Sequence, residues 1–153
     1  MSEENVEVVK SLLPAPIDLA EVFATEETID AIRLQYESLV QPDFVTVHDP
    51  KAVPMGIGTP TGDGVSVGIE GFITLWRDYL SAWESWLVTP TEFREAGDEK
   101  VLVLMSFRGR SKTHGVEIEL QGGNVFTLRD GRLARLEMFL ERRGALEAAG
   151  LSE

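Results

Sequence analysis

The chain has 153 residues, with 26 acidic and 14 basic side chains and a formal net charge of −12 at pH 7. This length predicts a single domain over residues 1–153, and 43% hydrophobic residues can form a buried core. The acidic balance argues against a nucleic-acid-binding protein, and the lack of cysteine excludes disulfides, thiol catalysis and cysteine-ligated metals. No apolar run reaches the roughly 18 residues of a membrane span, and the acidic start predicts no secretory signal. We therefore expect a cytoplasmic protein.

The first part of the chain is predicted to be mainly helical. An apolar repeat over residues 2–13, with acidic residues in its first turn, is typical of a helix. A short second helix should begin at Asp18, and a third is predicted over residues 25–39 from its N-cap and its apolar spacing. Residues 44–48 have the length and composition of a strand.

A long loop is predicted over residues 49–68, which contain three prolines and five glycines. Loops of this length in compact domains are usually functional lids or mobile segments. A glycine-rich phosphate cradle is the alternative interpretation. The glycine spacing matches neither common phosphate-binding pattern, and no helix opens directly from these glycines, so a flap or a plain loop is favoured.

The rest of the chain predicts one amphipathic helix, a run of strands and a closing helix. The helix runs from Gly68 to about Trp83 with aromatic residues on one broad face. The strand-like runs cover residues 85–93, 100–111, 116–128 and 133–140, and the closing helix covers residues 141–151. Helices followed by an antiparallel meander indicate an α+β fold.

Three stretches of this sequence resemble one family. They are NVFTLRDGRLARLEMFLER at residues 124–142, GIEGF at residues 68–72 and PDFV at residues 42–45. The chain resembles the SnoaL-like polyketide cyclase family of the nuclear-transport-factor-2-like superfamily. The resemblance implies a cone-shaped barrel, in which a strongly bent antiparallel sheet wraps around helices and leaves one deep pocket. It also implies a homodimer and a cofactor-independent protein, and family members include cyclases, isomerases and proteins without known catalysis.

The Asp130-Gly131 turn allows the pairing of the last two strands to be predicted from the sequence. A two-residue hairpin loop would pair Leu128 with Leu133, Phe126 with Arg135 and Asn124 with Glu137. Side chains alternate along a strand, so these six residues would share one face and line the pocket. The other face would be almost wholly apolar and would serve either as ordinary core or as a dimer contact; it would consist of Val125, Thr127, Ala134, Leu136 and Met138.

Glu137 is the main candidate catalytic residue. Within the resemblance, its position corresponds to the acid/base carboxylate of the cyclases, and the position of Asn124 corresponds to one where the cyclases place a histidine. An apolar setting makes a carboxylate a better base, because its charged form is desolvated. Asn124 cannot titrate, so a two-base scheme is lost. The alternative role for Glu137 is a salt bridge with Arg135 or Arg108 on a wet surface.

The two histidines do not predict a metal site. His48 ends the strand over residues 44–48 and could act as a general base at the pocket mouth, although a structural or exposed role is the more common one. His114 falls in a hairpin loop and is expected to be solvated. No carboxylate cluster has metal-ligand spacing, so no metal is expected.

The other candidate substrate-binding residues also have structural alternatives. Arg108 could hold an anionic oxygen or pair across the strands with Glu117 or Glu119. Tyr36 or Tyr79 could bond developing oxyanion charge, and Trp76 belongs either to an aromatic pocket floor or to plain core. A bulge at Gly122-Gly123 could change which side chains of residues 116–123 face the pocket.

Two functions from different classes remain open. The first is a cyclase- or isomerase-type enzyme that acts on a small, apolar, carbonyl-bearing molecule, with Glu137 as the acid/base, Asn124 as an oxyanion donor and His48 assisting. The second is a module that binds a hydrophobic metabolite without turnover, or that serves only for dimerisation. The polar groups on an aromatic face favour the first function, and the asparagine at position 124 favours the second.

Overall fold

The structure is a computed structural model of the chain and describes residues 2–12, 16–48 and 65–151. Most of the predicted loop, residues 49–64, lies outside the described residues. The flap and the phosphate cradle therefore both stay predictions. The helices are α1 Ser2–Leu12, α2 Leu19–Val22, α3 Glu26–Glu37, α4 Gly68–Leu80 and α5 Arg142–Ala149. The strands are β1 Ile17–Asp18, β2 Val40–His48, β3 Val65–Val67, β4 Trp83–Glu95, β5 Lys100–Ser111, β6 Glu117–Arg129 and β7 Arg132–Phe139.

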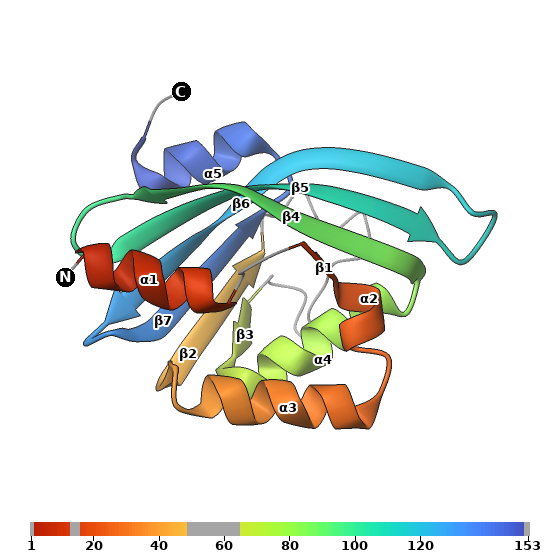
Figure 1. Cartoon of the computed structure of the whole chain (residues 1–153), viewed down its shortest axis with the longest axis horizontal. Helices are drawn as coiled ribbons and strands as arrows, with labels where there is room; N and C mark the ends of the chain where they lie inside the picture. Colours follow the sequence, from red (N-terminus) through yellow and green to blue (C-terminus); the bar gives the residue numbers. More distant parts are fainter. Residues whose placement is uncertain (1, 13–15, 49–64, 152–153) are drawn as a thin grey trace.

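The seven strands form one curved sheet in the order β1-β4-β5-β6-β7-β2-β3 (Figure 1). The predicted antiparallel meander from β4 to β7 is present, and β2 joins it beside β7 in the parallel direction. The expected α+β fold is therefore confirmed. The sheet remains open, because β1 and β3 form its two edges.

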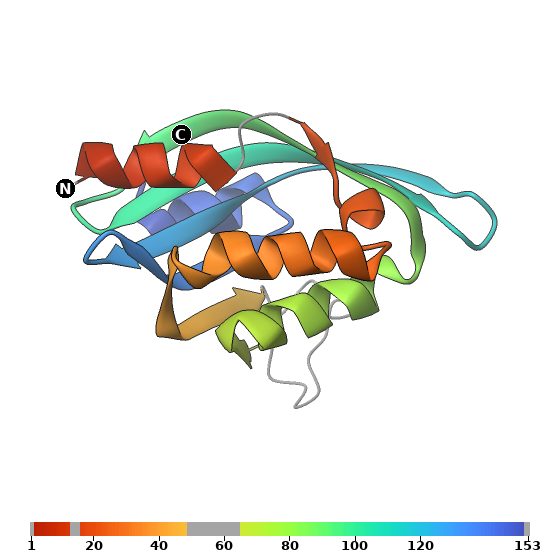
Figure 2. The same ribbon diagram turned by 60° about the horizontal axis from the view of Figure 1, so that its bottom comes forward.

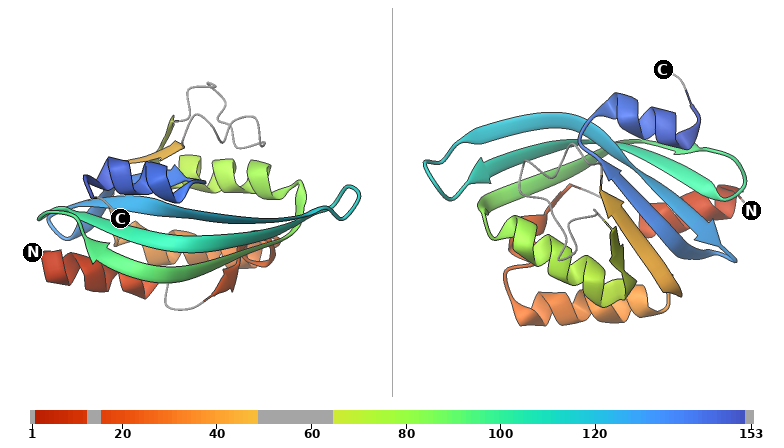
Figure 3. Two further views of the ribbon diagram at one scale, coloured as in Figure 1. Left: turned by 90° about the horizontal axis from the view of Figure 1, so that it is seen from above. Right: turned by 180° about the vertical axis from the view of Figure 1, so that it is seen from behind.

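Helices pack against both faces of the sheet. Figure 3 shows α5 on one side of the long strands and α3 and α4 on the other. The helices α3 and α4 lie side by side (Figure 2), and the guanidinium of Arg33 contacts the two carboxylate oxygens of Glu70 at 2.8 and 3.0 Å across them. This ion pair holds the pKa of Glu70 below its usual range.

Local sequence signals explain where the helices begin. The Thr25 side chain accepts the backbone N–H of Thr28 at the start of α3, as an N-cap does. Asp18 caps α2 in the same way by accepting the N–H of Ala20. The helix predicted to reach Trp83 is too long, because α4 ends at Leu80 and Trp83 already pairs with Ser111 in the sheet.

The Asp130-Gly131 turn forms as predicted, but the pairing beyond it differs. Both residues have positive φ angles, 55° and 75°, as a two-residue turn of this kind requires. Leu128 pairs with Leu133, whereas the preceding Thr127 pairs with Arg135. One residue of β7, Ala134, is therefore extra, and every pair farther from the turn is shifted by one.

The shift overturns two predicted pairs and the face assignment built on them. Asn124 pairs with Met138 and Phe126 pairs with Leu136, so the pairs Asn124–Glu137 and Phe126–Arg135 are wrong. A bulge changes which side chains point to each face, because alternation restarts after the extra residue. Leu136 and Met138 consequently belong to the main core, on the concave side of the sheet.

The predicted free apolar face is also wrong. On the convex side, Val125 packs with Leu102 and Leu104 beneath Ala145 and Leu146 of α5, which form a second core cluster. The homodimer stays a prediction, but this face no longer supplies the reason for it. The bulge considered at Gly122-Gly123 is absent, because the β5–β6 register is continuous.

Candidate functional site

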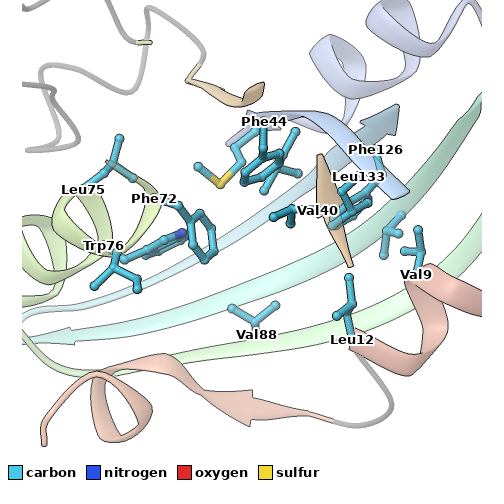
Figure 4. Close-up of a cluster of buried hydrophobic side chains, with 14 of the residues drawn as sticks. Val9, Leu12, Val40, Phe44, Phe72, Leu75, Trp76, Val88, Phe126 and Leu133 are labelled. Carbon is cyan, nitrogen blue, oxygen red and sulfur yellow. The ribbon is translucent and has the colours of Figure 1, made fainter. Parts of the chain in front are cut away.

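A cavity of about 140 Å³ lies between the concave face of the sheet and the helices. Its volume is similar to that of cavities that hold a single benzene ring, about 150 Å³. Figure 4 shows part of this interior, where Phe72 and Trp76 of α4 face the strands that carry Val88 and Phe126. The described wall consists of Leu12, Ile17, Leu19, Val22, Phe23, Ile32, Gln35, Tyr36, Phe44, Phe72, Trp76, Trp86, Val88, Met105, Phe107, Asn124, Phe126, Leu133, Leu136, Met138, Phe139 and Leu140.

Aromatic side chains dominate this wall. Phe72 and Trp76 lie one turn apart on α4, so both point to the same side of the helix. Tyr36 of α3 stacks on Phe72 with ring centroids 5.6 Å apart, and Phe23 stacks on Trp76 at 6.4 Å. Such a wall offers flat apolar surfaces to a ring-shaped ligand.

The polar groups of the described wall are few and uncharged. The polar wall residues are Gln35 and Asn124, which carry amides, Tyr36, which carries a hydroxyl, and Trp76, which carries an indole N–H. Trp86 also lines the wall, but its indole Nε1 atom is fully buried. Burial raises the pKa of Tyr36 to about 12, so its hydroxyl stays protonated and can donate a hydrogen bond near neutral pH. No described residue of the wall is an Asp, Glu, His, Lys or Arg.

Four of the predicted site residues meet in this cavity: Asn124, Phe126, Tyr36 and Trp76. Asn124 and Phe126 line the cavity because the face of β6 that was predicted to line the pocket is the concave face of the sheet. The predictions did not include Gln35, which lies one residue before Tyr36 on α3 and carries no apolar signal.

Glu137 and Arg135 do not line the cavity, and their predicted place there is wrong. The extra residue Ala134 turns both side chains to the convex side of β7. There the Glu137 carboxylate lies 3.5 Å from the Arg135 guanidinium, with side chains 18% and 48% exposed. This arrangement corresponds to the salt bridge that the sequence left open as the alternative.

Arg108 is also turned away from the cavity. It lies on the convex face of β5 with Leu102 and Leu104, and its guanidinium contacts the Glu119 carboxylate at 3.3 Å with both side chains exposed. The interpretation in which Arg108 points inward is wrong, because the inward residues of β5 are those at odd positions such as Val103. The cross-strand pair with Glu119 is the one predicted as the alternative.

The remaining predicted residues lie beside or beyond the cavity. Tyr79 is 2% exposed and packs edge-on against Trp76 and Trp86, so it supports the wall without forming part of it. His48 ends β2 opposite Met138, and its side chain lies outside the described part of the structure. His114 is exposed in the loop between β5 and β6.

Within the described ranges, no three histidine, aspartate or glutamate side chains come close enough together to bind a metal ion. No helix in residues 2–12, 16–48 or 65–151 is long and apolar enough to cross a membrane.

Solved structures with the same fold span almost the whole chain. A nuclear-transport-factor-2-like protein of unknown function from Burkholderia pseudomallei K96243 is 19% identical, with a TM-score of 0.64 over 94% of this chain and 95% of that one. A protein from Jannaschia sp. CCS1, classed provisionally as a SnoaL-like polyketide cyclase, is 17% identical, with a TM-score of 0.65 over 99% of this chain and 95% of that one. TerC, crystallised with polyporic acid, is 22% identical, with a TM-score of 0.63 over 96% of this chain and 98% of that one.

At these identities the structures establish a shared fold and leave activity open. No curated protein matches the sequence. The family model of the SnoaL-like domain matches residues 18–136, which include the cavity wall from Leu19 to Leu136. The chain therefore belongs to the SnoaL-like domain family.

Proposed function

We propose that this protein binds a small, uncharged, largely apolar molecule in the cavity and does so without turning it over. The observation that carries the proposal is the composition of the described wall, which is aromatic and aliphatic with a few uncharged polar groups. Enclosed apolar surface supplies the affinity for such a ligand, and the polar groups fix its orientation.

The polar groups favour a ligand that carries an oxygen atom. The Asn124 amide can donate one hydrogen bond and accept another, so it suits a carbonyl or a hydroxyl group. Tyr36 donates from a protonated hydroxyl, since burial raises its pKa to about 12. A charged ligand would lose its hydration without gaining an opposite charge from the described wall.

The cyclase or isomerase function has weaker support. Acid–base catalysis needs a titratable group within hydrogen-bond reach of the reacting atom. The predicted base, Glu137, lies on the opposite face of β7 beside Arg135. TerC was crystallised with a small molecule, polyporic acid, which agrees with ligand binding in this fold.

Calorimetric titration with acetophenone, a single aromatic ring with one carbonyl, tests the proposal. We expect saturable binding by the native protein and about tenfold weaker binding by Asn124→Leu, which keeps the side-chain size and removes the amide. Gln121→Leu is the matched control, because Gln121 is an exposed amide on the opposite face of the same strand.

Filling the cavity should abolish binding altogether. Val88 lies in the wall across from Trp76 (Figure 4), and Val88→Phe would occupy space that a ligand ring needs. Failure of every single-ring compound to bind the folded native protein at millimolar concentration would contradict the proposed function.

A further inference from the structure

We propose that the ligand is an aromatic carbonyl compound with an apolar tail, and that the tail leaves the cavity between α2 and α3. This ligand class rests on the proposed function and deepens it, because it adds the tail to the ring and the oxygen that the cavity wall already favours.

The cavity itself holds about one aromatic ring. Its volume of about 140 Å³ is close to the roughly 150 Å³ of a cavity that binds benzene. A ligand larger than one ring must therefore project from it.

The wall is partly exposed where β1, α2 and α3 contribute to it. The wall residues of α4, β4 and β5 are all buried, among them Phe72 at 7% and Val88 at 3% exposure. Figure 1 shows α2 beside the N-terminal end of α3. Six apolar wall residues in and next to these elements are partly exposed, and we call them the mouth: Ile17, Leu19, Val22, Phe23, Ile32 and Tyr36.

On α3 the mouth residues lie on the inner face of the helix. Ile32 and Tyr36 are one turn apart and share a face with Ile29, which is 1% exposed. Leu34 points to the opposite side and is 73% exposed. Gln35 lines the cavity and is also exposed, so it marks a point where the cavity meets solvent.

Stacked rings connect the mouth with the buried part of the wall. Tyr36 stacks on Phe72 with ring centroids 5.6 Å apart, and Phe23 stacks on Trp76 at 6.4 Å. Phe72 and Trp76 meet edge-on at 6.5 Å. An alkyl tail that follows these rings stays in contact with apolar groups and shields them from water.

The position of Asn124 gives the ligand its direction. Asn124 belongs to the sheet, and α3 lies on the other side of the cavity. A carbonyl group that bonds the Asn124 amide therefore leaves the opposite end of the ring toward α3. A tail attached opposite the carbonyl group fits this arrangement. A second copy of the chain could also cover the mouth, but it would leave the cavity empty, so we favour the tail.

Calorimetric titration with acetophenones that carry an alkyl group opposite the carbonyl tests the inference. Acetophenone, 4-ethylacetophenone and 4-butylacetophenone share the ring and the oxygen and differ in the tail. We expect one-to-one binding, with affinity rising about two- to fourfold for each added carbon. Equal affinities, or affinities that fall with tail length, would overturn the inference and leave the proposed function intact. If none of the three binds, the proposed function fails and this inference fails with it.

A substitution in the mouth separates a bound tail from general stickiness. Ile32→Thr keeps a branched side chain and replaces apolar surface with a hydroxyl group. It should weaken 4-butylacetophenone by at least about threefold more than it weakens acetophenone. Leu34→Thr is the matched control, because Leu34 is on the same helix and outside the cavity wall, and it should change neither affinity. Equal losses for the two compounds in Ile32→Thr would contradict a tail in the mouth.

Nuclear magnetic resonance locates the tail in the native protein. We expect nuclear Overhauser effects between the terminal methyl group of bound 4-butylacetophenone and the ¹³C-labelled methyl groups of Ile32. Leu140 is another partly exposed apolar residue of the wall, outside the mouth. Contacts with Leu140 in place of Ile32 would put the exit elsewhere and overturn the inference. A native dimer that Ile32→Thr dissociates, seen by light scattering, would also overturn it by making a second copy the occupant.

Discussion

The Asp18 carboxylate joins α2 to Trp86. Its Oδ1 atom accepts the backbone N–H of Trp86 at 3.0 Å and the backbone N–H of Ala20 at 3.0 Å. One oxygen therefore caps a helix and fixes that helix to β4. Because Leu19 and Val22 of α2 line the same cavity as Trp86, Asp18 connects two parts of the wall.

Removing this carboxylate should loosen the wall. We expect Asp18→Ala to lower the free energy of unfolding by about 1–2 kcal/mol, because a helix cap and a second hydrogen bond are lost together. Urea unfolding measures this change. Asp43→Ala is the control, since Asp43 forms an exposed ion pair with Arg129 that should be worth about 0–1 kcal/mol. An equal loss in the two variants would contradict the role of Asp18.

Gly109 should be essential for the shape of the cavity. A methyl group at Gly109 would collide with the rings of Trp86 and Trp83, at 2.5 and 2.9 Å, so Gly109→Ala must move them. We expect destabilisation by about 1–3 kcal/mol and loss of ligand binding, as in other overpacked cores. Gly71→Ala is the milder comparison, because its added Cβ atom would lie 3.3 Å from the Cβ atom of Ser66, a tight contact that a small shift relieves, and alanine favours its helix. Unchanged ligand affinity in Gly109→Ala would show that the Trp86 ring is not held by this contact.

The two tyrosines should make the fold sensitive to alkaline pH. Burial raises the pKa of Tyr36 from 10.0 to about 12 and raises the pKa of Tyr79 as well. Above pH 10 the unfolded chain releases these protons and the folded chain keeps them, so the folded state binds more protons and stability falls as pH rises. The fall should be at most about 1.4 kcal/mol per pH unit for each tyrosine.

Urea unfolding at pH 9, 10 and 11 measures this slope. Tyr36→Phe and Tyr79→Phe should each flatten it, because each removes one titrating group. A slope that is the same in both variants and in the native protein would assign the alkaline loss to other groups.

Local signals predicted the elements well, because each depends on a few neighbouring residues. The Thr25 N-cap and the Asp130-Gly131 turn lie where the sequence indicates, and β5 has its predicted ends, Lys100 and Ser111. The short edge strands β1 and β3 were not predicted. Two or three residues carry no alternating pattern, and only the neighbouring strand makes them part of the sheet.

Which residues line the site depends on the pairing register of β6 and β7, and the sequence near a turn determines that register only in part. The hairpin pairs as predicted at Leu128 and Leu133, and the extra residue Ala134 then shifts everything beyond it. Alanine tolerates a bulge without any glycine or proline signal to mark it, so the residues of β7 that face the cavity could not be identified from the pattern. Asn124 and Phe126 were placed correctly because β6 is regular opposite β5.

Glu137→Gln separates the binding function from the enzyme that the sequence suggested. The Glu137 side chain is 18% exposed and lies 3.5 Å from Arg135 on the convex face of β7, away from the cavity wall. Glutamine keeps its size and removes its charge, so we expect an unchanged affinity for acetophenone by calorimetry. The free energy of unfolding should fall by about 1 kcal/mol or less, because the Arg135 partner is half exposed and hydrated. Asn124→Leu is the contrasting variant, in which affinity falls and Glu137 is untouched. A tenfold loss of affinity in Glu137→Gln would show that β7 presents its carboxylate to the ligand in solution, and would restore Glu137 as the candidate acid/base.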